Sequence, residues 1–165
     1  MKITELLGEA TEYDKKQSVE RKKPKSWLKT VSAFANTGGG VLIFGVADND
    51  EIVGIENIKE ASEFVSQKIK ERIDPLPEVF MELHKLENDK EILSVKILAG
   101  EETPYYYNGD GTTEAFIRIG NETVTASASE LKRLVLRGRN SSYDSLTSSY
   151  EYDDFSFSKL RERFK

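Results

Sequence analysis

Apolar and polar positions follow a clear pattern between residues 26 and 46. In residues 26–35 the apolar side chains recur at spacings of three and four, which is typical of one face of a helix. Residues 36–40 read Asn-Thr-Gly-Gly-Gly and cannot continue that helix, because each glycine costs about 1 kcal/mol there relative to alanine. Residues 41–46 are apolar without alternation, as in a strand covered on both faces. The pattern predicts a helix, a tight turn and a buried strand, with residues 52–55 returning as a hairpin partner.

The rest of the chain alternates between helical and strand-like patterns. Residues 58–73 carry an apolar stripe with a polar back, and Pro75 ends this helix because the residue before a proline disfavours helical backbone. Ser127 and Glu130 form a capping box at the start of a last helix that we expect to end at Gly138. We therefore predict an α+β fold with a mixed, largely antiparallel sheet and about three helices. Strands are expected over 12–15, 79–86, 92–98, 105–107 and 114–123.

The composition changes after Gly138. Residues 140–149 are rich in serine, which is typical of a linker, and the chain beyond them resembles the start of a further element. We expect one domain over residues 1–138, and a linker with the opening of a C-terminal region over residues 139–165. The chain has no cysteine, which excludes disulfides and cysteine-ligated zinc. It has no apolar run long enough for a membrane span and no signal-peptide core, so we expect a cytoplasmic protein without a membrane partner.

The charge of the chain is uneven. A net charge of −5 weighs against a protein that coats nucleic acid without specificity, because such domains are usually basic. Residues 15–29, however, hold seven basic residues against one acidic residue, and a second basic group lies near the end of the last helix. These side chains either bind phosphate groups or form solvated surfaces. The basic residues are Lys15, Lys16, Arg21, Lys22, Lys23, Lys25 and Lys29, followed by Lys132, Arg133, Arg137 and Arg139.

Three short motifs resemble the signature of a known family. Residues 33–40 read Ala-Phe-Ala-Asn-Thr-Gly-Gly-Gly, residues 43–48 read Ile-Phe-Gly-Val-Ala-Asp, and residues 52–54 read Ile-Val-Gly. Their order and spacing resemble the Schlafen AlbA-like domain family, and the resemblance covers about residues 8–138. It implies a nucleic-acid-binding domain of a bacterial transcriptional-regulator-like protein. Apart from what the resemblance implies, we expect DNA rather than RNA as the partner, and a homodimer as a further expectation.

The glycine turn and one arginine have two interpretations each. A nucleotide-binding P-loop runs from strand to helix and ends in Gly-Lys-Ser/Thr, whereas here the order is reversed and that ending is missing, so we do not expect ATP binding. The turn either joins helix to strand or lets a ligand or nucleic-acid backbone approach closely. Arg118 either pairs with a buried acid or binds phosphate with both of its terminal nitrogens. The residues of the turn are Asn36, Gly38, Gly39 and Gly40.

The resemblance also implies an alternative in which the domain is a nuclease. In Schlafen proteins with RNase activity, two glutamates and one aspartate are implicated, and the nearest positions here are Glu9, Glu12 and Asp48. Three carboxylates held together would bind Mg²⁺ or Mn²⁺ and assist phosphodiester hydrolysis. The favoured interpretation has no cofactor and no catalysis, with Glu9 and Glu12 as surface acids and Asp48 as a turn residue. A third alternative is a dimerisation module that binds no ligand.

Overall fold

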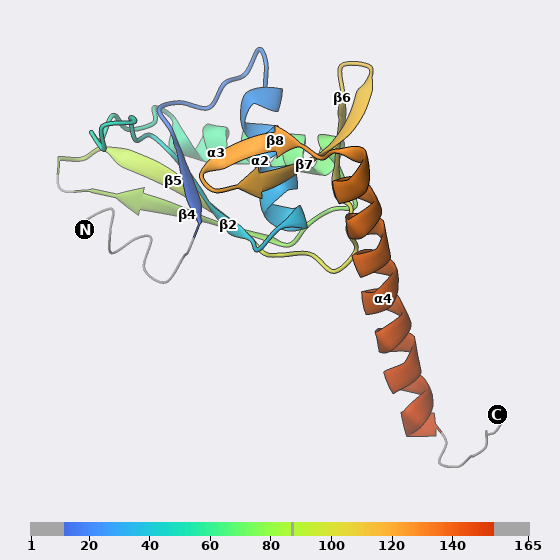
Figure 1. The fold of residues 1–165 in the computed structure, drawn as a ribbon. Coiled ribbons are helices and arrows are strands. Elements are labelled where there is room, and N and C mark those ends of the chain that lie inside the picture. Colours follow the sequence, from blue (N-terminus) through green and yellow to red (C-terminus); the bar gives the residue numbers. More distant parts are fainter. Residues whose placement is uncertain (1–11, 87, 154–165) are drawn as a thin grey trace.

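The computed structural model describes residues 12–86 and 88–153, with side chains described as far as residue 140. This part of the chain contains three helices and eight strands, and the strands form two four-stranded sheets (Figure 1). The predicted α+β class is confirmed, but the strands divide between two sheets. The helices are α2 (Lys25–Asn36), α3 (Ile58–Arg72) and α4 (Ala128–Asp153). The strands are β1 (Tyr13–Lys16), β2 (Gly40–Phe44), β3 (Ile73–Asp74), β4 (Val79–Lys85), β5 (Glu91–Ile97), β6 (Tyr106–Gly109), β7 (Thr112–Ile119) and β8 (Glu122–Thr125).

The first sheet is mixed and the second is antiparallel throughout. The first has the order β1-β2-β5-β4, in which β1 runs parallel to β2 and the other neighbours are antiparallel. The second has the order β3-β6-β7-β8. Strand β2 is buried on both faces, as its sequence predicts: Leu42 and Phe44 join the main core, while Val41 and Ile43 join a smaller cluster. Strands β1 and β4 are the outer strands of the first sheet.

Helix α2 packs against strands of both sheets and is buried on almost every side. Its apolar stripe, which includes Trp27 and Val31, lies in the main core as the sequence predicts. Its other side carries Thr30, Ser32 and Asn36, which are polar but no more than 1% exposed. The periodicity predicted one buried face only, because hydrogen bonding to a distant sheet leaves no apolar signal in the helix itself.

The segment after β2 does not form the predicted hairpin. Residues 52–55 contribute a single isolated bridge, between Val46 and Ile52, so the prediction of a second strand here is wrong. Gly45 has a φ of +107°, and its carbonyl accepts hydrogen bonds from the N–H groups of Val53 and Gly54 at 2.8 and 2.9 Å. The chain turns sharply at Gly45 because glycine tolerates this backbone conformation, and the loop then folds back on the end of β2.

Helix α4 is longer than predicted and projects away from the sheets (Figure 1). The Ser127 N-cap of the predicted capping box is confirmed, since the Glu130 N–H donates to Ser127 Oγ at 3.3 Å, whereas the Glu130 carboxylate accepts a hydrogen bond from Arg133. The predicted helix end at Gly138 is wrong, because the helix continues to Asp153. Gly138 instead lies where α4 touches the segment before β6: a Cβ there would be 2.1 Å from the Thr103 carbonyl oxygen. The division into residues 1–138 and 139–165 stays a prediction.

Gly138→Ala is expected to destabilise the protein although it improves helix propensity. In an open helix this change gains roughly 1 kcal/mol. Here the new methyl group meets backbone, and the segment that bears Thr103 must shift, with a net loss of about 1–2 kcal/mol in the free energy of unfolding. Urea denaturation of Gly138→Ala and of the exposed-site control Val135→Ala measures the effect. A gain in stability in Gly138→Ala would contradict the close packing of α4 on this segment.

Candidate nucleic-acid interface

Several basic residues between 15 and 29 form ion pairs within the domain. The Arg21 guanidinium donates two hydrogen bonds to Glu60, at 2.8 and 2.7 Å, and so ties the loop before α2 to α3. The Lys25 ammonium pairs with Glu114 at 2.6 Å. Hydrogen bonding to these carboxylates raises the pKa of both cations. The segment therefore presents less unpaired positive charge than its sequence indicates. In the described part of the chain, the basic residues of this segment that have no ion pair are Lys22, Lys23 and Lys29.

Arg118 lies inside the protein. Its side chain is only 3% exposed, and its guanidinium lies 5.0 Å from the centre of the Phe34 ring. It donates a hydrogen bond to Thr123 Oγ1 at 3.0 Å, and its Nη2 atom is 3.9 Å from a carboxylate oxygen of Glu12. This position favours the structural interpretation of Arg118, because a guanidinium buried between α2 and β1 has little access to a phosphate outside.

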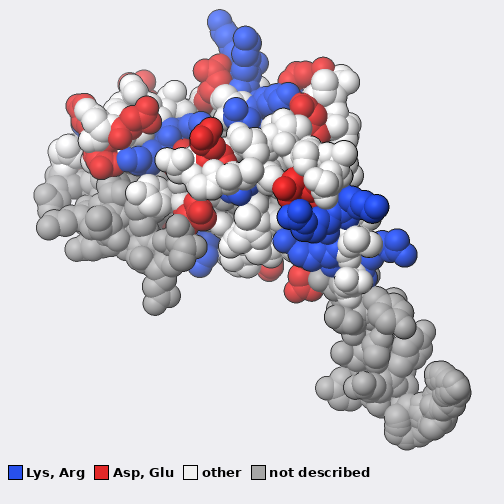
Figure 2. All heavy atoms as spheres, in the orientation of Figure 1, with Lys and Arg blue, Asp and Glu red and all other residues white. Residues whose placement is uncertain are grey.

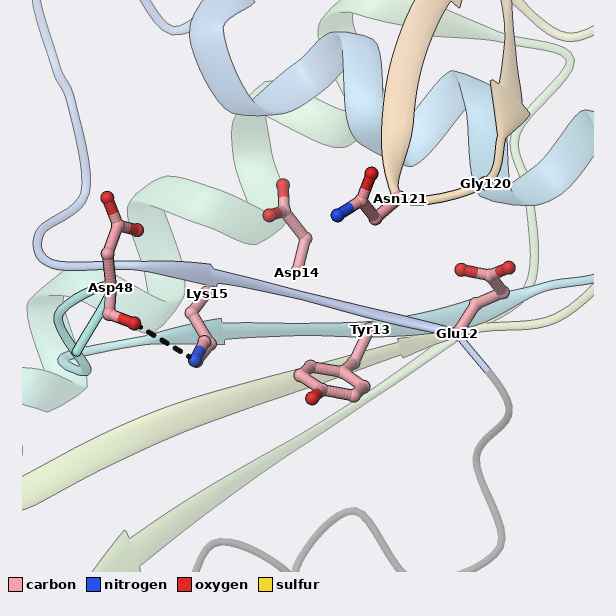
Figure 3. Close-up of a pocket in the computed structure, with 7 residues that line it drawn as sticks. All are labelled: Glu12, Tyr13, Asp14, Lys15, Asp48, Gly120 and Asn121. Carbon is pink, nitrogen blue, oxygen red and sulfur yellow. Dashed lines mark hydrogen bonds between the residues drawn. The ribbon is translucent and has the colours of Figure 1, made fainter. Parts of the chain in front are cut away.

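Two of the three carboxylates considered for metal binding line one pocket beside β1. Glu12 and Asp48 lie toward opposite ends of this pocket, which has a volume of about 410 Å³ (Figure 3). Glu9 lies outside the described residues. Within the described ranges, no three acidic or histidine side chains are grouped closely enough to hold a metal ion. The pocket is lined by Glu12, Tyr13, Asp14, Lys15, Asp48, Gly120 and Asn121.

Between Glu12 and Asp48 the pocket holds a lysine and an aspartate that are not among the three carboxylates implied by the family resemblance. Figure 3 shows Lys15 and Asp14 on opposite sides of β1. The Lys15 ammonium pairs with Asp50 and donates to the Asp48 carbonyl oxygen at 3.4 Å. A cation of the protein itself therefore already lies near Asp48. The hydrogen bond to Asp50 raises the pKa of Lys15. The Asp14 side chain points to the same side of the chain as that of Glu12, just before β1 (Figure 3), because the two are two residues apart; that spacing is the sequence signal that could have identified it.

Asn36, at the end of α2, is a buried hydrogen-bonding centre. Its Nδ2 group donates to the carbonyl oxygens of Tyr105 and Phe116, each at 2.9 Å, and its Oδ1 atom accepts the Tyr105 N–H at 2.6 Å. One side chain therefore joins α2 to the segment before β6 and to β7. These contacts give Asn36 a structural role in the signature motif.

The three glycines of the turn lie in different surroundings. Gly39 has a φ of +78°, and a Cβ there would be 2.8 Å from the Ile97 carbonyl oxygen. A Cβ on Gly40 would be 2.6 Å from the Phe34 ring, whereas one on Gly38 would meet nothing within 4 Å. The geometry thus supports a tight helix-to-strand turn at Gly39 and Gly40, and leaves open space only at Gly38.

Basic side chains gather on the surface over the first turns of α4 (Figure 2). On the inner side of this helix, Leu134 is 6% exposed and its carbonyl accepts a hydrogen bond from Thr103 Oγ1 at 2.6 Å. With 3.6 residues per turn, the opposite side is centred on Leu136, which is 48% exposed and surrounded by cations. We call this surface the basic face of α4. It consists of Lys132, Arg133 and Arg139, together with Arg137 at its edge, three residues after Leu134.

The four cations of the basic face differ in their contacts. Arg137 donates from Nη2 to the Asn36 carbonyl oxygen at 2.6 Å, where a positive charge is favourable at the C-terminal end of α2. Arg133 pairs with Glu130 at 3.1 Å, but its side chain remains 73% exposed. Lys132 and Arg139 are exposed, and neither has an ion pair in the described part of the chain. These two, with Arg133, are the side chains of this face that are best placed to bind an external anion.

The comparison with known protein families agrees with the motif. Residues 9–127 match the family model described as Schlafen, AlbA_2; the match ends just before α4. Among solved structures, the chain is similar to the N-terminal domain of a RecG-related protein from Nitrosomonas europaea, with 22% identity, coverage of 73% of this chain and 86% of that chain, and a TM-score of 0.49. No curated protein matches the chain. None of the described helices is both long and apolar enough to cross a membrane.

Proposed function

We propose that this chain, which belongs to the Schlafen AlbA_2 family, a nucleic-acid-related kind of domain, binds duplex DNA. In this proposal the contact is made by the basic face of α4, a helix that begins after the matched residues 9–127. The grouping of Lys132, Arg133 and Arg139 around exposed Leu136 on a projecting helix is the main support. Duplex DNA carries one negative charge per about 1.7 Å of its axis, and its major groove admits an α-helix. In this proposal the domain supplies the DNA contact of a transcriptional regulator, and other regions supply the response.

The overall acidity of the chain is compatible with this proposal. Three of the seven cations of residues 15–29 pair with Asp50, Glu60 and Glu114, so the positive charge of this segment is partly neutralised. The basic face of α4, by contrast, has one described acidic partner, Glu130, for its four cations. A local field of one sign attracts the phosphate backbone even when the whole protein is negatively charged. Lys22 and Lys23 are secondary candidates for phosphate contact.

The double variant Lys132→Glu/Arg139→Glu is expected to bind DNA at least about tenfold more weakly at low salt, because two phosphate contacts become repulsive. Fluorescence anisotropy with a short labelled duplex measures the affinity. The matched control is Lys59→Glu/Lys96→Glu, which makes the same change in net charge at exposed positions away from α4. Equal losses of affinity in both double variants would show a general charge effect and contradict a site on α4.

The nuclease alternative rests on the pocket that Glu12 and Asp48 share. It is tested with the same duplex, and with a single-stranded RNA, incubated with Mn²⁺ and separated on a denaturing gel. Cleavage that requires the metal and disappears in Asp48→Ala would favour an enzyme over a binding module. Intact nucleic acid under conditions in which the protein binds DNA would favour the binding module, which needs no cofactor.

A further inference from the structure

Strand β4 is an outer strand of the first sheet with an uninterrupted edge. Its pairing with β5 runs without a break from Val79 opposite Ile97 to Lys85 opposite Glu91. Its seven residues include no proline and no glycine. No other strand within the described residues pairs with β4. Prolines, bulges and very short strands are among the means by which proteins keep a sheet edge from pairing with another chain, and β4 has none of these three, although it carries the charged Glu82 and Lys85.

The backbone hydrogen bonds show which groups face this open edge. Leu98 N–H donates to the Glu78 carbonyl at 3.0 Å, and Leu86 N–H donates to the Lys90 carbonyl at 2.8 Å. Hydrogen-bonded and non-hydrogen-bonded pairs alternate in an antiparallel ladder, so the even-numbered residues from 78 to 86 direct their backbone groups toward β5. The N–H and C=O groups of the odd-numbered residues 79–85 therefore point outward along the edge.

Exposed apolar side chains flank the same edge on both faces of the sheet. Phe80 is 55% exposed on one face and Leu83 is 51% exposed on the other. Beside Leu83 lies an open groove of about 500 Å³ between β4 and α3, which also includes Met81 and Gln67. A partner that pairs with β4 would cover apolar surface on both faces while it binds the outward backbone groups.

We propose that β4 pairs antiparallel with the same strand of a second copy, about a two-fold axis at Leu83. This register places Leu83 opposite the partner's Leu83 and Glu82 opposite the partner's His84, so that a carboxylate meets an imidazole on each side of the axis. Centring the pair on Glu82 instead would place two glutamates opposite each other, which is unfavourable. The product is a continuous eight-stranded sheet, and its formation does not depend on DNA binding.

The absence of cysteine from the natural sequence allows a direct test of this register. In Leu83→Cys, the paired Cα atoms would be about 5.5 Å apart, which suits a disulfide. Phe80→Cys is the matched control, since it is similarly exposed on the same strand; its Cα atoms would be roughly 20 Å apart. After mild oxidation, a non-reducing gel is expected to show a linked dimer for Leu83→Cys and monomer for Phe80→Cys. Linkage of neither variant, or of both to the same extent, would overturn the pairing.

Sedimentation equilibrium of the full chain gives a second test without cross-linking. Leu83→Lys places two like charges at the axis and removes the apolar contact there, so the dimer dissociation constant is expected to rise about tenfold or more. Circular dichroism should remain unchanged, because Leu83 is half exposed in the single chain. A native protein that stays monomeric at high concentration, or a Leu83→Lys variant that dimerises as tightly, would overturn the inference.

Discussion

Replacing Asn36 with alanine is expected to lower the free energy of unfolding by about 3–5 kcal/mol, which is close to the limit that a single substitution reaches. The change removes three buried hydrogen bonds of 2.9 Å or less, two to Tyr105 and one to Phe116. It also leaves buried backbone groups with fewer partners and a small cavity between α2 and β7. Chemical denaturation, monitored by circular dichroism, measures this loss in the free energy of unfolding.

Asn121→Ala is the matched control for this prediction. Asn121 is exposed in the turn between β7 and β8, so its replacement should change stability by no more than about 0.5 kcal/mol. Asn36→Asp adds a further comparison, because it keeps the acceptor for Tyr105 but places a carboxylate against two carbonyl oxygens; we expect a loss as large as that of alanine. A loss below about 1 kcal/mol in Asn36→Ala would contradict the role of Asn36 as the link between three segments.

Gly39→Ala and Gly38→Ala are expected to behave very differently although the two glycines are adjacent. Alanine at position 39 must adopt a φ of +78° with its Cβ 2.8 Å from the Ile97 carbonyl oxygen, so we expect a loss of about 2–4 kcal/mol. Alanine at position 38 meets nothing within 4 Å, and the free energy of unfolding should stay within about 0.5 kcal/mol of the native value.

Thermal and chemical unfolding of the two variants, together with their DNA affinity, separates the interpretations of the turn. A structural turn predicts that Gly38→Ala keeps native stability and native affinity. A stable Gly38→Ala protein that no longer binds DNA would show that the turn approaches the ligand, and the proposed site on α4 would then be incomplete. Equal stabilities of Gly38→Ala and Gly39→Ala would contradict the turn geometry itself.

Local sequence signals predicted the elements whose causes are local. The helix, glycine turn and buried strand over residues 26–46 follow from periodicity and from the inability of glycine to continue a helix. The N-cap at Ser127 involves residues only three apart, and the structure shows its hydrogen bond from the Glu130 N–H. Gly138 misled the prediction because glycine is common just after helices; here it lies inside one, where Thr103, remote in sequence, requires a residue without a side chain.

The electrostatic character of the surface could not be predicted in the same way. Lys15, Arg21 and Lys25 form a dense basic run in the sequence, but their partners lie 35 to 89 residues away along the chain. Only the fold brings these acids into contact with the run, and they neutralise part of its charge. Lys132, Arg133 and Arg139 remained prominent because they lie on the outer side of one helix, at a spacing that the sequence does contain, whereas Arg137 reaches back to the Asn36 carbonyl oxygen.

The dependence of DNA affinity on salt concentration is the most direct test of binding through the basic face of α4. Each phosphate contact contributes a slope of about −0.9 to a plot of log affinity against log salt, so three or four contacts predict a slope of about −3 to −4. Lys132→Ala/Arg139→Ala should bring the slope closer to zero by about 2, because two contacts are lost. A native slope near zero, or a slope that this double substitution leaves unchanged, would contradict the proposed interface.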